Sequence, residues 1–273
     1  MPDLAILIVS YNVRGDLEQC VRSLLAHPPA MSHDVVVVDN ASTDGSVEAI
    51  RAQFPSVRVL ALEGNTGFAH ANNEGIRQTR SDLILLLNSD TVVPAGALDR
   101  LVDQFRTLPG AAIVGPRLID GRGAPELSFG RMISPWNELR QKLSAKWAGP
   151  ARLAAMTSRT REVDWVSGAC LLVSRQHAEA AGLLDERYFM YCEDVDFCAA
   201  VRSNGGRVYF TSAAEIVHLR GRSWRAMPTA TTEAFRRSQL AFYDKHLPFW
   251  APFLRLYLRL KGRPSESSVD SRQ

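Results

Sequence analysis

The amino-acid sequence predicts an α/β fold built on a mostly parallel sheet, with helices on both faces and a smaller mixed region in the second half. Apolar runs alternate with helical patterns over the first hundred residues. These runs contain no polar alternation, as in Val35-Val36-Val37-Val38. Strands of this kind are buried on both faces, and a parallel sheet covered by helices provides that environment. The composition, with 46% hydrophobic residues among 273, is that of an ordinary globular protein.

Four strands and three helices are expected in the first half of the chain. Asp16 can cap the first helix, because Gln19 follows three residues later. Asp44 precedes the second helical pattern. The expected strands cover residues 4–9, 35–38, 57–62 and 83–87, and the third helix covers about 69–79.

The pattern changes after about residue 110. Residues 127–162 lack clean strands, so this part of the chain predicts irregular structure. We expect one domain over 1–246, with halves 1–110 and 111–246, followed by a basic amphipathic segment and disordered tail over 247–273. The strands expected in the second half are 112–118, 163–174, 208–211 and 216–218, with a short helix at 176–181.

Missing motifs exclude several classes of protein. No stretch reaches the roughly 18–20 apolar residues that span a bilayer, and the first residues lack the positive charge of a signal peptide. A P-loop sequence is absent. Glu126 stands where a third glycine would follow Gly121 and Gly123, so a dinucleotide-binding site is unsupported. The four cysteines form no CxxC pair, which favours free thiols in a reducing cytoplasm.

The formal net charge of +3 conceals a segregation of charge along the chain. Residues 1–126 carry 10 basic and 15 acidic side chains, and residues 163–218 carry 4 and 8. Residues 127–162 carry 7 basic and 2 acidic side chains, and residues 219–263 carry 10 and 2. An acidic body with two basic segments predicts an anionic partner for those segments.

Polar residues follow three of the expected strands. They form the stretches Ser10-Tyr11-Asn12, Asp39-Asn40 and Asn88-Ser89-Asp90. Ligands of open parallel sheets bind outside the carboxyl ends of the strands, so three polar tips at one edge indicate a ligand site. The same residue types also start ordinary turns. A short carboxylate at a strand tip, such as Asp90, suits Mg²⁺ or Mn²⁺.

Two further features carry chemistry. Glu193, Asp194 and Asp196 place three acids within four positions. This pattern suits either the first turn of a helix, where acids complement the helix dipole, or a general base. His218 follows an apolar pair and heads the basic stretch 219–223. It is either a core histidine or a contact to a metal or phosphate.

Taken together, these stretches resemble glycosyltransferase family 2, the inverting nucleotide-sugar transferases of GT-A fold, and within it the rhamnosyltransferase-like branch. The resemblance implies a Rossmann-like, mostly parallel sheet with helices on both faces, plus a smaller mixed region on the acceptor side. It covers most of residues 4–225. The matching stretches are 9–12, 37–45, 65–75, 87–90, 165–169, 191–198 and 218–223.

The resemblance implies a nucleotide-sugar site at the strand tips. In it, the Asp39 carboxylate would accept the N3–H of a uracil or thymine ring, and Gly67 would permit close backbone approach. Asn88 stands in place of the first aspartate of the family's DxD motif, which removes one negative charge near the diphosphate. The residues implied for the donor are Ser10, Tyr11, Asp39, Asn65, Gly67, Asn72, Ser89 and Asp90.

The resemblance also implies a metal-dependent single displacement with inversion at the anomeric carbon. Asp194 would be the base that takes the proton of the acceptor hydroxyl, and Asp90 and His218 would ligate Mg²⁺ or Mn²⁺. Arg220 or Arg222 would help to stabilise the leaving diphosphate. The residues implied for the acceptor are Trp165, Gly168, Ala169 and Glu193.

The implied partners are a nucleotide sugar, with dTDP-rhamnose or a UDP-sugar as donor, and a glycan or lipid-linked acceptor in cell-envelope polysaccharide synthesis. Residues 249–261 mix aromatic and leucine side chains with Arg255 and Arg259. A helix of this kind can lie in the interface of an anionic membrane, here the inner face of the plasma membrane. The alternative is a helix that packs on the core or forms an oligomer.

Three other functions stay open at this point. A sugar-phosphate nucleotidyltransferase also uses a parallel sheet and a carboxylate-bound metal, but it needs a glycine- and basic-rich loop after the first strand, where this chain offers only Arg14. A non-catalytic relative that binds sugar nucleotides is the second alternative. The third is a nucleic-acid-binding protein, against which the acidic body and the absence of a recognition motif both argue.

Overall fold

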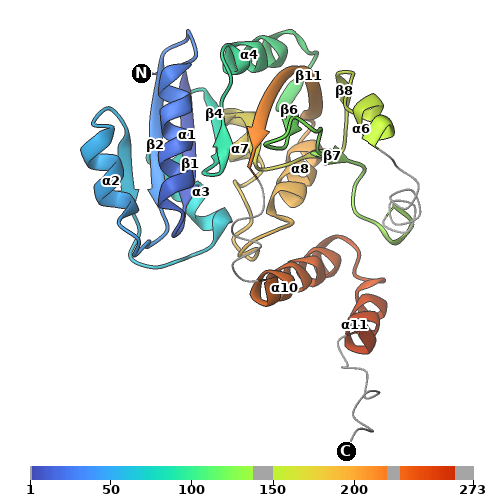
Figure 1. Cartoon of the computed structure of the whole chain (residues 1–273). Helices are drawn as coiled ribbons and strands as arrows, with labels where there is room; N and C mark the ends of the chain where they lie inside the picture. The colour runs from blue at the N-terminus through green and yellow to red at the C-terminus, as the bar shows by residue number, and fades with distance from the viewer. Residues whose placement is uncertain (1, 138–149, 220–227, 262–273) are drawn as a thin grey trace, which may run out of the picture.

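The computed structural model describes residues 2–137, 150–219 and 228–261. Within these residues one mixed sheet of nine strands runs through the molecule in the order β3-β2-β1-β4-β10-β6-β11-β5, with β8 paired to β11 (Figure 1). The first four strands are parallel, as the sequence predicts. They are β1 (Leu4–Ser10), β2 (His33–Asp39), β3 (Arg58–Ala61) and β4 (Leu83–Asn88).

The second half of the sheet is mixed. Strand β10 (Cys170–Ser174) is antiparallel to both β4 and β6 (Ala111–Ile119), so the sheet continues across residue 110 without a break. Strand β11 (Arg207–His218) runs parallel to β6 and joins two expected strands through an irregularity between Thr211 and Glu215. The remaining strands are β5 (Thr91–Val92), β7 (Phe129–Gly130), β8 (Arg161–Glu162) and β9 (Trp165–Val166).

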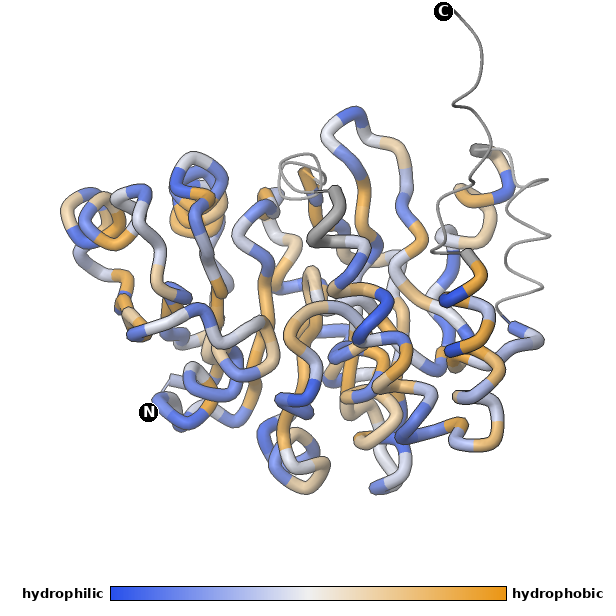
Figure 2. The backbone as a smooth tube through the Cα atoms, turned by 90° about the horizontal axis from the view of Figure 1, so that it is seen from below, coloured by the Kyte–Doolittle hydropathy of each residue, from blue (hydrophilic) through white to orange (hydrophobic). Residues whose placement is uncertain are grey.

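Helices cover both faces of the sheet, which confirms the expected layers. Side chains of β1 that point to one face pack against α1 (Arg14–Ala26), α2 (Ser46–Gln53) and α4 (Ala97–Thr107). Those that point to the other face pack against α3 (Phe68–Arg77), α7 (Arg175–Ala180) and α8 (Glu193–Ser203). Figure 2 shows the hydrophobic strands as orange tube through the middle of the molecule.

Two local expectations need correction. Helix α1 begins at Arg14 rather than after Asp16, which is three residues earlier than expected, and the backbone N–H of Arg14 donates to Asp44. The expected strand 163–174 is two short strands, β9 and β10, separated by residues 167–169. The four cysteines are free and buried, as expected.

The chain ends, as far as it is described, in two helices that pack away from the sheet. Helices α10 (Pro228–His246) and α11 (Ala251–Lys261) lie at the lower right in Figure 1. Helix α10 has no counterpart in the sequence prediction. Helix α6 (Pro150–Met156) lies in the basic segment, of which 138–149 is outside the described residues, as is the expected disordered tail. No described helix is long and apolar enough to cross a bilayer.

Candidate active site

The carboxyl ends of three parallel strands meet at one edge of the sheet. Ser10 at the end of β1 is the register partner of Asp39 at the end of β2. Asn88 at the end of β4 is the partner of Val9, one residue before Ser10. The polar tips therefore lie side by side, because the hydrogen-bonded register of a parallel sheet aligns them.

At the ends of β1 and β2, Asp39 and Ser10 are almost fully buried. One Asp39 oxygen, Oδ2, accepts the backbone N–H of Ser42 at 2.8 Å. The other, Oδ1, is buried without a hydrogen-bond partner among the described residues, as is the hydroxyl of Ser10. Tyr11 is 46% exposed beside them. The site thus offers a fixed carboxylate with one acceptor atom that has no partner among the described residues, and the exposed Tyr11 follows Ser10 in the chain.

The amide of Asn40 fixes the loop that carries Asn65 and Gly67. Its Nδ2 donates to Asn65 Oδ1 at 2.9 Å and to the Gly67 carbonyl at 3.2 Å. Its Oδ1 accepts the backbone N–H of Thr66 at 2.9 Å. A single buried side chain therefore satisfies three groups of this loop. Sequence reasoning placed Asn40 only at a strand tip and gave it no role.

Gly67 brings the same loop against a distant turn. Its φ of 88° and ψ of 171° belong to a region that is essentially restricted to glycine. A Cβ at this position would lie 2.5 Å from the carbonyl oxygen of Phe189, and the next residue, Phe68, donates its backbone N–H to that oxygen at 2.8 Å. The close backbone approach expected at Gly67 is therefore made to Phe189. Asn72, one turn into α3, is buried with its Oδ1 unpartnered among the described residues.

On the other side of the edge, His218 lies between two carboxylates. Its Nε2 is 3.2 Å from Asp90 Oδ1, and its Nδ1 is 3.2 Å from Glu126 Oε2. The pairing of β5 with β11 places Thr91 opposite His218 and so brings Asp90 to the ring. Burial lowers the pKa of this imidazole, but the hydrogen bonds to Asp90 and Glu126 outweigh it and raise the pKa to about 9.

Glu126 is a residue that sequence reasoning missed. It entered only as the position where a third glycine fails to appear. It reaches His218, 92 residues away, because β6 and β11 pair in parallel up to Ile119 and Val217. No local pattern in the sequence signals that contact. A carboxylate on the second ring nitrogen is the arrangement that commonly orients metal-binding histidines.

The residues expected to hold a metal fit that role as a pair. Asp90 and His218 supply a carboxylate oxygen and an imidazole nitrogen, which are donor types that Mn²⁺ accepts. Among the described residues, no group of three or more His, Cys, Asp or Glu side chains converges as a complete metal site. Ser89 lies next to Asp90 and is partly exposed. The two expected diphosphate contacts, Arg220 and Arg222, lie outside the described residues.

The expected base stands where the edge meets helix α8. Asn88 donates its backbone N–H to the Ala169 carbonyl at 2.9 Å. This hydrogen bond places residues 168–169 next to the carboxyl end of β4. There the Gly168 N–H donates to Asp194 Oδ2 at 2.9 Å, and Val195 N–H donates to Asp194 Oδ1 at 2.8 Å. Gly168 therefore touches the predicted base itself.

Glu193 and Asp194 are adjacent carboxyls at the start of α8, of which Glu193 is buried and Asp194 is half-buried. Burial raises the pKa of Glu193, and the neighbouring charge of Asp194 raises it further. Burial also raises the pKa of Asp194, but backbone hydrogen bonds from Gly168 and Val195 oppose that shift. Both carboxyls therefore hold their protons to a higher pH than ordinary carboxyls do, and the two backbone hydrogen bonds favour the ionised form of Asp194.

Trp165 packs beside the start of α8 and fixes the neighbouring chain. Its indole N–H donates to the Arg131 carbonyl at 2.9 Å, and its ring packs over Gly130. It also contacts both the core beneath α8 and the cluster that includes α10. Ala169 is buried and contributes its backbone to the row of strand ends.

Buried oxygen atoms without partners gather at this edge. Seven buried side-chain polar atoms of the described residues lack a hydrogen-bond partner. An unsatisfied buried group costs about 1–3 kcal/mol, so native proteins keep such groups mostly where a ligand or water completes them. Five of the seven belong to the strand tips and the residues around them, namely Ser10 Oγ, Asp39 Oδ1, Asn72 Oδ1, Asn88 Oδ1 and Glu193 Oε2.

The fold and the site define a glycosyltransferase of GT-A fold. Two solved structures superpose on it with low sequence identity. A mannosyltransferase of Pyrobaculum calidifontis in complex with GDP-Man and Mn²⁺ matches 95% of this chain and 70% of its own, with a TM-score of 0.61 and 19% identity. GalNAc-T7 with UDP, GalNAc and Mn²⁺ matches 81% of this chain with a TM-score of 0.60 and 15% identity, and this chain spans only 44% of it.

The chain belongs to glycosyl transferase family 2. The model of that family matches residues 5–176, which is more than half of the chain. An N-acetylglucosaminyl-diphospho-decaprenol L-rhamnosyltransferase of Mycobacterium tuberculosis (strain CDC 1551 / Oshkosh) is 31% identical over 94% of this chain and 89% of its own length. The expected family and the expected fold are therefore both confirmed, and the nucleotidyltransferase and nucleic-acid-binding alternatives fall away.

Proposed function

We propose that this chain transfers L-rhamnose, or a related hexose, from a dTDP- or UDP-sugar to a hydroxyl of a lipid-linked glycan, with inversion at the anomeric carbon. The observation that carries the proposal is the row of buried, unpartnered oxygens along the strand ends that leads to Asp194. The activity named for the mycobacterial relative supports N-acetylglucosaminyl-diphospho-polyprenol as the acceptor class.

Asp194 acts as the general base of a single displacement in this proposal. It stays ionised because two backbone N–H groups hold its carboxylate, and it takes the proton of the acceptor hydroxyl as that oxygen attacks the anomeric carbon. Attack occurs from the side opposite the diphosphate, which inverts the configuration. Glu193, Gly168, Ala169 and Trp165 form the surroundings in which the acceptor is held.

The nucleotide occupies the other end of the row. Asp39 Oδ1 accepts the N3–H of uracil or thymine, and Tyr11 covers the ring. Asn65, Gly67 and Asn72 shape the neighbouring wall, and Ser10 and Ser89 complete it. Asp90 and His218 would hold Mg²⁺ or Mn²⁺, and such an ion supplies charge stabilisation for the leaving diphosphate. Glu126 orients the His218 ring through Nδ1.

A panel of nucleotide sugars tests the donor half of this proposal. We expect dTDP-rhamnose or a UDP-sugar, with Mn²⁺, to raise the melting temperature of the protein by several degrees, since a ligand at about 100 times its Kd stabilises by roughly 2.7 kcal/mol. GDP-mannose serves as the comparison. Stabilisation by GDP-mannose alone, or by none of the donors, would overturn the assignment of Asp39.

Asp90→Ala is expected to weaken Mn²⁺ binding by at least about tenfold, because it removes one of the two protein ligands. The free Mn²⁺ signal in electron paramagnetic resonance measures this in the presence of dTDP, independently of turnover. Asp82→Ala is the matched control, because Asp82 is an exposed carboxylate that precedes the opposite end of β4. Equal Mn²⁺ affinity in wild type and Asp90→Ala would remove Asp90 from the ligand set.

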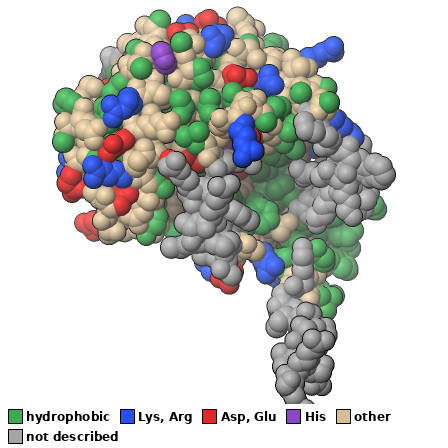
Figure 3. Space-filling model, in the orientation of Figure 1, with side chains coloured by type: hydrophobic (Ala, Val, Ile, Leu, Met, Phe, Trp, Pro, Cys, Tyr) green, Lys and Arg blue, Asp and Glu red, His purple; other side chains and the backbone are tan. Residues whose placement is uncertain are grey.

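Helix α11 carries an exposed apolar face that suits peripheral contact with an anionic membrane. Leu256 and Leu260 of this helix are 58% and 61% exposed, and Phe249, which precedes the helix, is 74% exposed. Figure 3 shows hydrophobic side chains gathered at the lower right, where Figure 1 places α10 and α11. Arg259 is exposed on the same helix. Because the proposed acceptor is lipid-linked, we expect this face to contact the cytoplasmic side of the membrane.

Substitution of Leu256 and Leu260 by serine is expected to lower binding to anionic vesicles by at least about tenfold, since both leucines expose apolar area that a bilayer would bury. Co-sedimentation with phosphatidylglycerol vesicles measures this, and pure phosphatidylcholine vesicles are the control for the electrostatic part. Unchanged sedimentation, or a wild-type dimer in light scattering that the substitutions abolish, would mean that the face does not dock on lipid.

A further inference from the structure

The turn that leads into Asp194 packs against helix α10. Side chains of Tyr188, Cys192 and Val195 form one apolar cluster with Phe242 and Tyr243 of α10. Helix α11 adds Ala251 and Leu254 to the same cluster. The hydroxyl of Ser238 on α10 donates to the Met190 carbonyl at 2.7 Å. Both C-terminal helices therefore form part of the wall behind the predicted base.

The backbone of this turn is strained. Tyr191 and Cys192 are consecutive non-glycine residues with φ of 70° and 66°, in the left-handed region. Each such residue costs of the order of 1–3 kcal/mol and persists only where the surrounding structure holds it. Cys192 is the N-cap of α8, so this conformation sets the direction in which Glu193 and Asp194 leave the turn.

Asp196 ties the first turn of α8 to the end of α10. It is 1% exposed and accepts hydrogen bonds from Lys245 Nζ at 2.8 Å and His246 Nε2 at 2.6 Å. The Tyr188 hydroxyl donates to it at 3.2 Å. Residues two apart on a helix point about 200° away from one another, so Asp194 faces Gly168 while Asp196 faces α10. The turn is thereby held from both sides.

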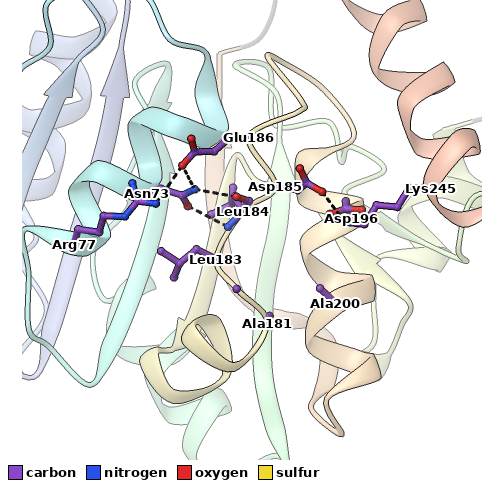
Figure 4. Close-up of a pocket in the computed structure, with 11 residues that line it drawn as sticks. Asn73, Arg77, Ala181, Leu183, Leu184, Asp185, Glu186, Asp196, Ala200 and Lys245 are labelled. Atoms are coloured by element: carbon purple, nitrogen blue, oxygen red, sulfur yellow. Dashed lines mark hydrogen bonds and ion pairs between the residues drawn. The ribbon is translucent and has the colours of Figure 1, made fainter.

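A cavity of about 320 Å³ lies between α3, α8 and α10, next to this contact. Figure 4 shows Lys245 directed at Asp185 and Asp196 on one side of it, and Arg77 and Asn73 near Glu186 on the other. These charges are paired with one another. The cavity is therefore bordered by a structural network that links α8 to α10.

We propose that Lys245 and His246 are positioning residues for the transfer reaction: by holding Asp196 they fix the strained turn and set the Asp194 carboxylate against the Gly168 N–H. The inference rests on the proposed function for the role of Asp194. It assigns helix α10, which lies beyond the residues that the family model matches, to the catalytic machinery of this chain.

Lys245→Met tests this inference, because methionine keeps the apolar stem and removes the ammonium group. We expect kcat, normalised to the concentration of protein that binds donor, to fall roughly 10- to 100-fold. A displacement of about 1 Å at a reacting group has effects of that size. The donor Kd, measured by calorimetry, stays within about twofold. Arg22→Met is the control, since Arg22 is an exposed cation on α1, on the other face of the sheet from α8.

A double-mutant cycle separates positioning from general loss of stability. If Lys245 acts through Asp196, Asp196→Asn combined with Lys245→Met costs little more than either change alone. Lys245→Arg, which keeps the charge, restores most of the turnover. Multiplying effects in the double variant, or a wild-type kcat in Lys245→Met, would overturn the inference. Failure of the wild-type chain to transfer any sugar would instead overturn the proposed function.

Discussion

Asp194→Asn is expected to lower turnover by roughly 10²- to 10⁴-fold and to leave the affinity for the nucleotide sugar unchanged. Asparagine keeps the shape of the side chain and can still accept the Gly168 N–H, but it cannot take a proton from the acceptor hydroxyl. Steady-state transfer rates and donor calorimetry measure the two halves of the prediction. A turnover within threefold of wild type would remove Asp194 as the base.

Asp103→Asn is the control for this substitution, because Asp103 is exposed on α4, on the other face of the sheet from α8. The pH profile gives a second test. Both carboxyls of the Glu193–Asp194 pair have raised pKa values, so they keep their protons to a pH above the ordinary carboxyl range near about 4. The base works only after losing its proton, so kcat/KM falls as pH falls through that raised value. In Asp194→Asn this limb disappears from the residual rate.

Gly67→Ala is expected to destabilise the protein by roughly 2–4 kcal/mol and to reduce turnover in the molecules that still fold. The added Cβ would lie 2.5 Å from the Phe189 carbonyl oxygen and 2.9 Å from its Cα, both of which are backbone atoms that cannot rotate away. The Phe189 turn must then move, and with it the start of α8. A fall in melting temperature of the order of 10 °C follows from that free energy.

Gly182→Ala is the control that separates the cost of a left-handed backbone from the cost of the steric clash with Phe189. Gly182 also has a left-handed φ, of 82°, but nothing lies within 4 Å of a Cβ placed there. This control is expected to cost about 1–2 kcal/mol, the usual penalty of a left-handed conformation, with no loss of turnover. Equal effects of the two substitutions on stability and turnover would show that the contact between Gly67 and Phe189 is dispensable.

The sequence predicts the first half of the molecule well, for physical reasons. The unbroken apolar runs of β1, β2 and β4 leave little freedom other than a buried parallel sheet, and parallel register then places Ser10 beside Asp39. The position of Asp39 in the site follows from local pattern alone. Asp16 shows the limit of this reasoning, because a contact between Arg14 and Asp44 moved the helix start.

The second half of the molecule depends on contacts between distant residues, which local patterns do not encode. Glu126 reaches His218 only because β6 and β11 pair. Lys245 and His246 reach Asp196 only because α10 packs on the turn before α8, and no periodicity in residues 228–246 predicted that helix or its partner. The contact of Gly67 with the backbone of Phe189 likewise joins distant parts of the chain, and no local pattern predicts it.

The most direct test of the proposed function is a transfer assay with purified protein, Mn²⁺, dTDP-L-rhamnose and a synthetic N-acetylglucosaminyl-diphospho-polyprenol, with the anomeric configuration of the product determined by NMR. We expect one rhamnose added per acceptor, with a configuration at the anomeric carbon opposite to that in the donor, and a rate from Asp194→Asn that is lower by roughly 10²- to 10⁴-fold. A product that retains the donor configuration, or an Asp194→Asn rate within threefold of wild type, would contradict the single displacement through Asp194.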